Sequence, residues 1–206
     1  MIVIHHLNNS RSQRILWFME ELGVPYEIKH YARDNVTNLA PPELLAIHPL
    51  GKSPVVSDGD EVLAESGMII DVLARRNHSE LAVDVNSPDY PQYTHWLHFA
   101  EGSAMLPFML ALYTSRLGEA GAPLQPRIRA EIANHLSYVE NHLAGRTYFV
   151  GDRLTGADIQ MSFIGEMAKV NGALAKLPNL KAWLDRIHAR PQWQTALTKG
   201  GPYLFA

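Results

Sequence analysis

Residues 8 to 14 read Asn-Asn-Ser-Arg-Ser-Gln-Arg and stand just before an apolar run with helical spacing. A serine hydroxyl at a helix N-terminus donates a hydrogen bond beside the positive end of the helix dipole, and both effects stabilise an anion. A free thiol has a pKa of about 8.5, so lowering it by about one or two units creates a nucleophilic thiolate at neutral pH. Ser10 or Ser12 could equally be the ordinary N-cap of this helix. The segment therefore suggests activation of a bound thiol, and the alternative is that its serines only cap the helix.

A second candidate segment is Lys52-Ser53-Pro54, at the start of a short β-branched run. Proline cannot donate a hydrogen bond to a strand ladder, so it lies at an edge or a bend. A cis Ser53-Pro54 bond would turn the backbone N–H and C=O of Ser53 outward, where an extended peptide could pair with them. A trans proline that begins a strand is the structural alternative.

A third candidate is Glu65-Ser66, where another apolar helical pattern begins. Backbone N–H groups at a helix N-terminus, a serine hydroxyl and the dipole favour a carboxylate. Glu65 could hold an ammonium group beside it. Together the two residues would satisfy the amino-acid end of a γ-glutamyl peptide, although an ordinary N-cap with an acidic neighbour explains the same pair.

The elements that position these segments follow from local patterns. Residues 2–4 are β-branched, and a helical apolar pattern over residues 15–22 ends at Gly23, before a second strand at 25–29. Strand, helix and strand in this order form a βαβ unit with parallel strands. Asp58-Gly59 between two short apolar runs predicts a β-hairpin, and Pro41-Pro42 predicts the first turn of a short helix.

The chain is expected to have two domains. Residues 78–91 lose periodicity and contain serine, asparagine and proline, as an inter-domain linker does. Residues 1–77 form the α/β domain, and residues 92–206 carry only helical patterns, the first of them one long helix from Tyr90 to Arg116. The sequence Thr155-Gly-Ala-Asp158 predicts a capping box at the start of a later helix. The fold class is α/β plus all-α.

Composition excludes several functions. The 206 residues include no cysteine, so the chain has no thiol chemistry or disulfide of its own. A net charge of −3 without basic runs argues against nucleic-acid binding. The N-terminal apolar stretch is too short for a signal peptide or membrane span, so a cytoplasmic protein is expected. The pairs His5-His6 and His95/His98 supply too few ligands for a metal site.

Taken together, the motifs resemble those of the cytosolic glutathione S-transferases, and among them the serine-type members of bacteria and fungi. The resemblance covers essentially the whole chain and is carried by residues 9–14, 20–27, 48–54 and 65–66. It implies a thioredoxin-like N-terminal domain and a helical-bundle C-terminal domain. It also implies a homodimeric detoxification enzyme that conjugates glutathione, its cosubstrate, to small electrophilic hydrophobic substrates.

The resemblance also assigns roles to residues. Ser53, with Pro54 cis, would pair with the cysteinyl part of glutathione, and Glu65 and Ser66 would hold its γ-glutamyl end. Lys52 would lie near the glycyl carboxylate. Asn38 or Glu43 would line the same site.

The group that activates the thiol depends on register. In serine-type members such as the theta and delta classes, the serine stands four residues before an arginine, which here selects Ser10 before Arg14. Ser12 matches the cysteine of the beta class, and Asn9 matches the zeta-class serine. Ser10 is therefore the predicted activating group, with Ser12 and Asn9 as alternatives.

The second substrate is expected to contact the long helix, where Met109 and Tyr113 are the pocket candidates. Methionine with an aromatic residue forms an adaptable apolar wall, although such residues are also common in cores and dimer interfaces. The same thiolate could serve a glutathione-dependent isomerase, dehalogenase or peroxidase. A different class is a non-catalytic binding or regulatory protein that keeps the fold.

Overall fold

A computed structural model describes residues 1–206, and the chain divides into two compact units. The first unit joins Met1–Ala82 to the C-terminal segment Ile187–Ala206, and the second is Val83–Arg186. The sequence placed all of residues 92–206 in one helical domain, whereas the C-terminal segment groups with the first unit. The physical reason is its packing: Gln13 donates to the Ala196 carbonyl at 2.9 Å, and Trp193 meets Trp17 edge-on at 5.5 Å between ring centroids.

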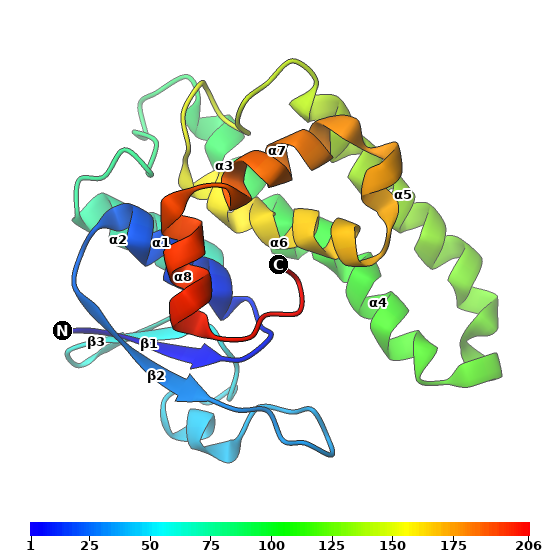
Figure 1. Ribbon diagram of the computed structural model, residues 1–206, viewed down its shortest axis with the longest axis horizontal. Coiled ribbons are helices and arrows are strands. Elements are labelled where there is room, and N and C mark those ends of the chain that lie inside the picture. The colour runs from blue at the N-terminus through cyan, green and yellow to red at the C-terminus, as the bar shows by residue number, and fades with distance from the viewer. The chain divides into compact units, whose positions relative to one another are not determined.

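The first unit contains the whole β-sheet (Figure 1). Its elements are β1 (Ile2–Leu7), α1 (Ser12–Leu22), β2 (Tyr26–Tyr31), the 3₁₀ helix η1 (Pro42–Ala46), β3 (Val55–Asp58), β4 (Glu61–Ala64), α2 (Ser66–Arg76) and α8 (Pro191–Gly200). The second unit is helical. Its elements are α3 (Tyr90–Phe99), η2 (Ala100–Ala104), α4 (Met105–Ser115), η3 (Gly118–Leu124), α5 (Gln125–Leu143), α6 (Gly156–Val170), η4 (Ala173–Lys176) and most of α7 (Pro178–His188).

The sheet has the strand order β2-β1-β3-β4. β1 and β2 are parallel, with Ile4 opposite Ile28, whereas β3 and β4 are antiparallel to their neighbours. The predicted βαβ unit and hairpin are therefore confirmed. In the first unit, α1, α2 and α8 lie over one face of the sheet and η1 lies on the other (Figure 1). Because side chains alternate along a strand, Ile4 and His6 face one side and His5 the other.

Two local predictions need correction. The expected single helix from Tyr90 to Arg116 is interrupted by the π-helical turn η2, so α3 and α4 are separate regular helices. The helical pattern that begins at residue 65 also predicts one apolar side of α2 with Met68, Ile69, Val72 and Leu73. Ile69 and Leu73 are buried as expected and Ile70 is buried with them, whereas Val72 is half-buried and Met68 is 40% exposed.

The second unit is held by α6, which is buried along most of its length. The predicted capping box is present: the Thr155 side chain and the Asp158 backbone N–H pair, and the Thr155 backbone N–H donates to Asp158 Oδ2 at 3.0 Å. Asp158 Oδ1 also accepts from the Phe149 N–H at 2.9 Å and the Trp183 indole N–H at 3.0 Å. The helix start is thus tied to two other parts of the unit. None of the helices is long and apolar enough to cross a membrane.

Candidate functional site

The loop between β1 and α1 carries a chain of hydroxyl groups. Helix α1 begins at Ser12, and Ser10 Oγ accepts the Ser12 backbone N–H at 3.1 Å. The two serine hydroxyl oxygens lie 2.7 Å apart. Ser12 is fully buried, and its Oγ accepts the Leu7 N–H at 3.2 Å. Ser12 is therefore bound into the first strand, with Ser10 on the outer side of this chain.

His6 on β1 continues the chain into the core. Its Nδ1 lies 2.9 Å from Ser12 Oγ, and its Nε2 lies 3.1 Å from the Gly200 carbonyl oxygen at the end of α8. Burial, with a smaller effect of His30, lowers the pKa of His6 to about 4, so the ring is neutral at pH 7. A carbonyl can only accept, so the ring hydrogen is on Nε2 and Nδ1 is an acceptor.

Arg33, which follows β2, organises the same loop and has no signal in the local sequence. Its guanidinium donates to the backbone carbonyls of Asn8 at 3.1 Å, Asn9 at 3.2 Å and Asn38 at 3.0 Å. Asn9 has a positive φ of 50°, and its Oδ1 accepts the Leu204 backbone N–H at 2.9 Å. Burial, with a smaller contribution from the repulsion of Arg11, lowers the pKa of Arg33. The loop that bears Ser10 is thus held by Arg33 and by the backbone of Leu204, and it lies beside the positive charges of Arg11 and Arg33.

The Ser53-Pro54 peptide bond is cis, as the sequence suggested. Pro54 is buried directly before β3, and the Ser53 hydroxyl donates to the His5 carbonyl at 2.9 Å. Lys52 is exposed beside them. This contact fastens the segment to the central strand of the sheet.

Helix α2 begins at Ser66, and Glu65 precedes it with a φ of +68°. Such a backbone is uncommon for a residue other than glycine and indicates a locally constrained position. Glu65 is exposed, whereas Ser66 is 4% exposed. Buried Arg14, in the first turn of α1, donates from Nη2 to Ser66 Oγ at 2.6 Å. This bond places the N-terminal turns of α1 and α2 side by side.

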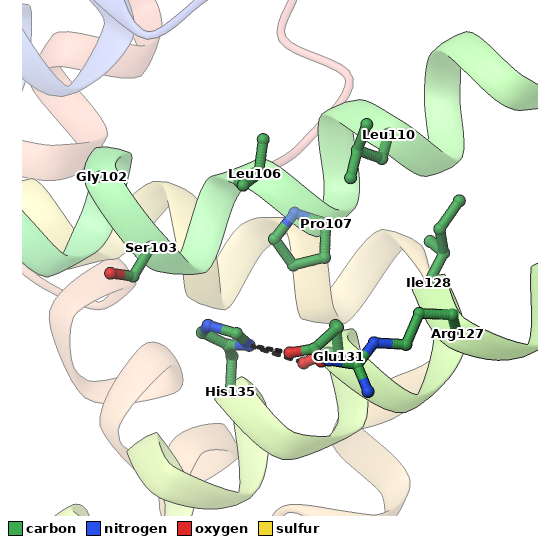
Figure 2. A pocket seen from close by; sticks show the side chains of 9 residues that line it. All are labelled: Gly102, Ser103, Leu106, Pro107, Leu110, Arg127, Ile128, Glu131 and His135. Carbon is green, nitrogen blue, oxygen red and sulfur yellow. Dashed lines mark hydrogen bonds and ion pairs between the residues drawn. The ribbon is translucent and has the colours of Figure 1, made fainter. Parts of the chain in front are cut away.

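The second unit has a cavity of about 370 Å³ between η2, α4 and α5 (Figure 2). Its walls combine apolar side chains with one polar stripe on α5. The lining residues are Gly102, Ser103, Leu106, Pro107, Leu110, Arg127, Ile128, Glu131 and His135. Met109 and Tyr113, the expected second-substrate residues, are not among them; Tyr113 is 56% exposed and Met109 half-buried. No group of three or more histidine, aspartate or glutamate side chains is arranged to hold a metal ion.

Comparison with known proteins places this geometry in a family. Residues 1–75 match the model of the glutathione S-transferase N-terminal domain, and residues 99–191 match that of the C-terminal domain. Glutathione S-transferase 3 of Schizosaccharomyces pombe is 38% identical over 216 residues, which cover 97% of this chain and 88% of that protein. The chain belongs to the glutathione S-transferase family. It has the fold and the transferase activity of that family, as the sequence predicts.

Solved structures of family members have the same fold. A glutathione S-transferase from Actinobacillus pleuropneumoniae superposes with a TM-score of 0.88 at 37% identity, covering 97% of this chain and 93% of that one. A sphingomonad glutathione S-transferase, solved in complex with glutathione, superposes with a TM-score of 0.82 at 24% identity, covering 97% and 98% of the two chains. The thioredoxin-like first unit and the helical second unit are therefore those of the family.

Proposed function

We propose that this transferase binds glutathione in its first unit, along Ser53 and cis Pro54, with the γ-glutamyl end at Glu65 and Ser66. The observation that carries the proposal is the 2.6 Å bond between Arg14 and Ser66. It brings together the N-terminal turns of two helices, and both turns attract anions. One turn suits the γ-glutamyl carboxylate and the other the thiolate of the same small molecule. Exposed Lys52 offers a cation to the glycyl carboxylate.

Ser10 is the group proposed to donate to the sulfur. The Ser12 hydroxyl already contacts Leu7, His6 and Ser10, and Ser12 has no exposed surface. The Asn9 side-chain oxygen is engaged by the Leu204 N–H. Ser10 lies at the end of the hydroxyl chain away from His6 and keeps 7% of its surface exposed. The thiolate stabilised there attacks an electrophilic carbon of the second substrate, so the nucleophile belongs to the cosubstrate.

The second substrate is proposed to be a small hydrophobic electrophile that contacts Met109 and Tyr113 on α4. Metal-free chemistry, a homodimer and a cytoplasmic location remain predictions from the sequence and its family resemblance. An aryl halide is the appropriate probe of conjugation, because displacement of the halide by the thiolate gives a directly measured product.

Calorimetry and thiolate absorbance test the proposal. Wild-type protein should bind glutathione in the millimolar range or tighter, and the ultraviolet absorbance of the bound thiolate should titrate below the pKa of free glutathione. Ser10→Ala should retain binding but raise the bound thiol pKa and reduce aryl halide turnover. An unchanged thiol pKa and turnover would reject Ser10, and no binding of glutathione would favour a non-catalytic relative of the enzyme.

A further inference from the structure

The first unit contains a buried histidine, His6, behind the Ser10 hydroxyl. His6, Ser12 and Ser10 form one continuous series of contacts, with 2.9 Å from Nδ1 to Ser12 Oγ and 2.7 Å between the hydroxyl oxygens. His6 and Ser12 have at most 2% exposed surface. Neither residue belongs to the proposed glutathione contacts, yet both determine what the Ser10 hydroxyl can do.

The direction of this series is fixed at its inner end. Nε2 of His6 donates to the Gly200 carbonyl, so Nδ1 needs a donor and receives the Ser12 hydroxyl hydrogen. Ser12 Oγ then accepts at its other positions, from the Leu7 N–H at 3.2 Å and from the Ser10 hydroxyl. With no thiolate bound, the Ser10 hydrogen therefore points inward, and Ser10 presents a lone pair that can accept the hydrogen of a protonated thiol. To donate to a thiolate, Ser10 must turn this hydrogen outward.

We propose that His6, acting through Ser12, is a positioning residue that turns the Ser10 hydroxyl inward and so opposes ionisation of the thiol bound there. The inference rests on the proposed role of Ser10. His6 does not touch the thiol, and the other titratable group against its ring is His30 of β2, edge-on at 5.5 Å between centroids.

The number of hydrogens available to these contacts decides whether His6 raises or lowers the pKa of the bound thiol. Three contacts lie in series: sulfur to Ser10, Ser10 to Ser12, and Ser12 to Nδ1. A protonated thiol supplies one hydrogen and each hydroxyl another, so all three contacts are filled. A thiolate leaves two hydrogens for three contacts. If Ser10 donates to the thiolate and Ser12 keeps its hydrogen on Nδ1, the two hydroxyl oxygens, 2.7 Å apart, face each other with no hydrogen between them. If Ser12 donates to Ser10 instead, Nδ1 faces an oxygen lone pair. If Ser12 turns to the Leu7 carbonyl, 3.2 Å away, Nδ1 also loses its donor.

In each arrangement two buried acceptors face each other with no hydrogen between them, which is unfavourable, so the series favours the protonated thiol. Replacing His6 by an apolar ring removes the acceptor Nδ1. Two hydrogens then serve two contacts, and Ser10 can donate outward at no loss. His6→Phe should therefore increase the acid dissociation constant of the bound thiol about tenfold, which corresponds to a pKa about one unit lower.

The test measures the pKa of enzyme-bound glutathione from thiolate absorbance in a set of four variants. His6→Phe and Ser12→Ala should each lower it, and the double variant should lower it no further than either alone, because Ser12 carries the effect of His6. His5→Phe is the matched control: His5 is a buried neighbour on the same strand that contacts Tyr31 and Ser57 instead of Ser12. It should leave the thiol pKa unchanged.

Binding of S-methylglutathione, which has no ionisable thiol, verifies that each variant keeps its site. If His6→Phe does not fold, Ser12→Ala carries the test alone. A thiol pKa that stays constant or rises in either variant overturns the proposal. Failure of the proposed function would give different results. Wild-type protein would then not bind glutathione, or Ser10→Ala would leave the thiol pKa unchanged.

Discussion

Arg14 and Ser66 are joined by a buried 2.6 Å hydrogen bond between the first turns of α1 and α2. The guanidinium only donates, so Ser66 Oγ accepts from Arg14. The bond holds the Ser66 hydroxyl at the start of α2, where the γ-glutamyl carboxylate is proposed to bind. A residue of α1 therefore orients a side chain at the end of α2.

The first prediction concerns Ser66→Ala. Removing the hydroxyl deletes the proposed hydrogen bond to the γ-glutamyl carboxylate, and a hydrogen bond to a charged group contributes about 1.5–3 kcal/mol. Glutathione affinity should fall about tenfold or more, with kcat at saturating glutathione nearly unchanged, because the lost contact holds ground state and transition state alike. Ser66→Thr keeps the hydroxyl and is the control. Equal affinities for wild type and Ser66→Ala would contradict the assignment.

The second prediction concerns Gly200, where α8 approaches α1. A Cβ at this position would lie 2.2 Å from Gln13 Oε1 and 3.1 Å from Leu16 Cδ1. Gly200→Ala should lower the free energy of unfolding by about 1–3 kcal/mol, as overpacking in a core does. Chemical denaturation measures the loss.

Gly102→Ala is the matched control for Gly200→Ala. Gly102 is also in a helical segment, but nothing lies within 4 Å of its Cβ position. Alanine there should be neutral or slightly stabilising, because it is the better helix former. Similar losses in both variants would show that the close contact at Gly200 is not the cause.

Several features of the site and of the fold were predictable because their signals are local. Proline before a β-branched run, a helix start at Ser66 and the Thr155–Asp158 pair each involve a few neighbouring residues, and each is present in the structure. Short-range hydrogen bonds and backbone preferences determine such features, so these features depend little on contacts with distant residues.

The rest depends on contacts between distant residues. The bond between Gln13 and Ala196 joins positions 183 residues apart, and the one between His6 and Gly200 joins positions 194 apart. No periodicity or motif in the sequence predicts that the C-terminal helix α8 packs on α1. The contacts of Arg33 also have no local sequence signal, because its three carbonyl partners belong to two segments, residues 8–9 and residue 38, that meet only in the folded unit.

The third prediction tests Asp158 in the second unit. Burial raises the pKa of its carboxyl to about 6 while its hydrogen bonds lower it, so the group is mostly ionised at pH 7. All its partners are donors: the Phe149 N–H, the Thr155 N–H and hydroxyl, and the Trp183 indole. Asp158→Asn turns an amide NH₂ toward one of these donors. The free energy of unfolding at pH 7 should fall by about 2–3 kcal/mol.

Asp152→Asn provides the comparison, since Asp152 is an exposed aspartate in the preceding turn. Its stability should change by less than about 0.5 kcal/mol, as for most surface substitutions. Urea denaturation of both variants at the same pH measures the difference. An Asp158→Asn protein as stable as Asp152→Asn would show that the capping network contributes little.

The fourth prediction concerns the pH dependence that buried His6 gives to stability. Its folded pKa of about 4 lies below the ordinary value of 6.5, so the fold favours the neutral ring. The unfolded chain binds the extra proton first, and stability that is complete above pH 6.5 is lost as the pH falls toward 4. This one group should therefore remove about 2 kcal/mol between pH 7 and pH 5.

His6→Phe isolates that contribution, because the phenyl ring cannot take up a proton while the other titrating groups stay. The free energy of unfolding of wild type minus that of His6→Phe should fall by about 2 kcal/mol on going from pH 7 to pH 5. His98→Phe, at an exposed position, should show no comparable change. If the difference between wild type and His6→Phe is the same at both pH values, His6 does not resist protonation in the fold. The ring could then carry a proton on Nδ1, and Ser12 would no longer be obliged to donate to it.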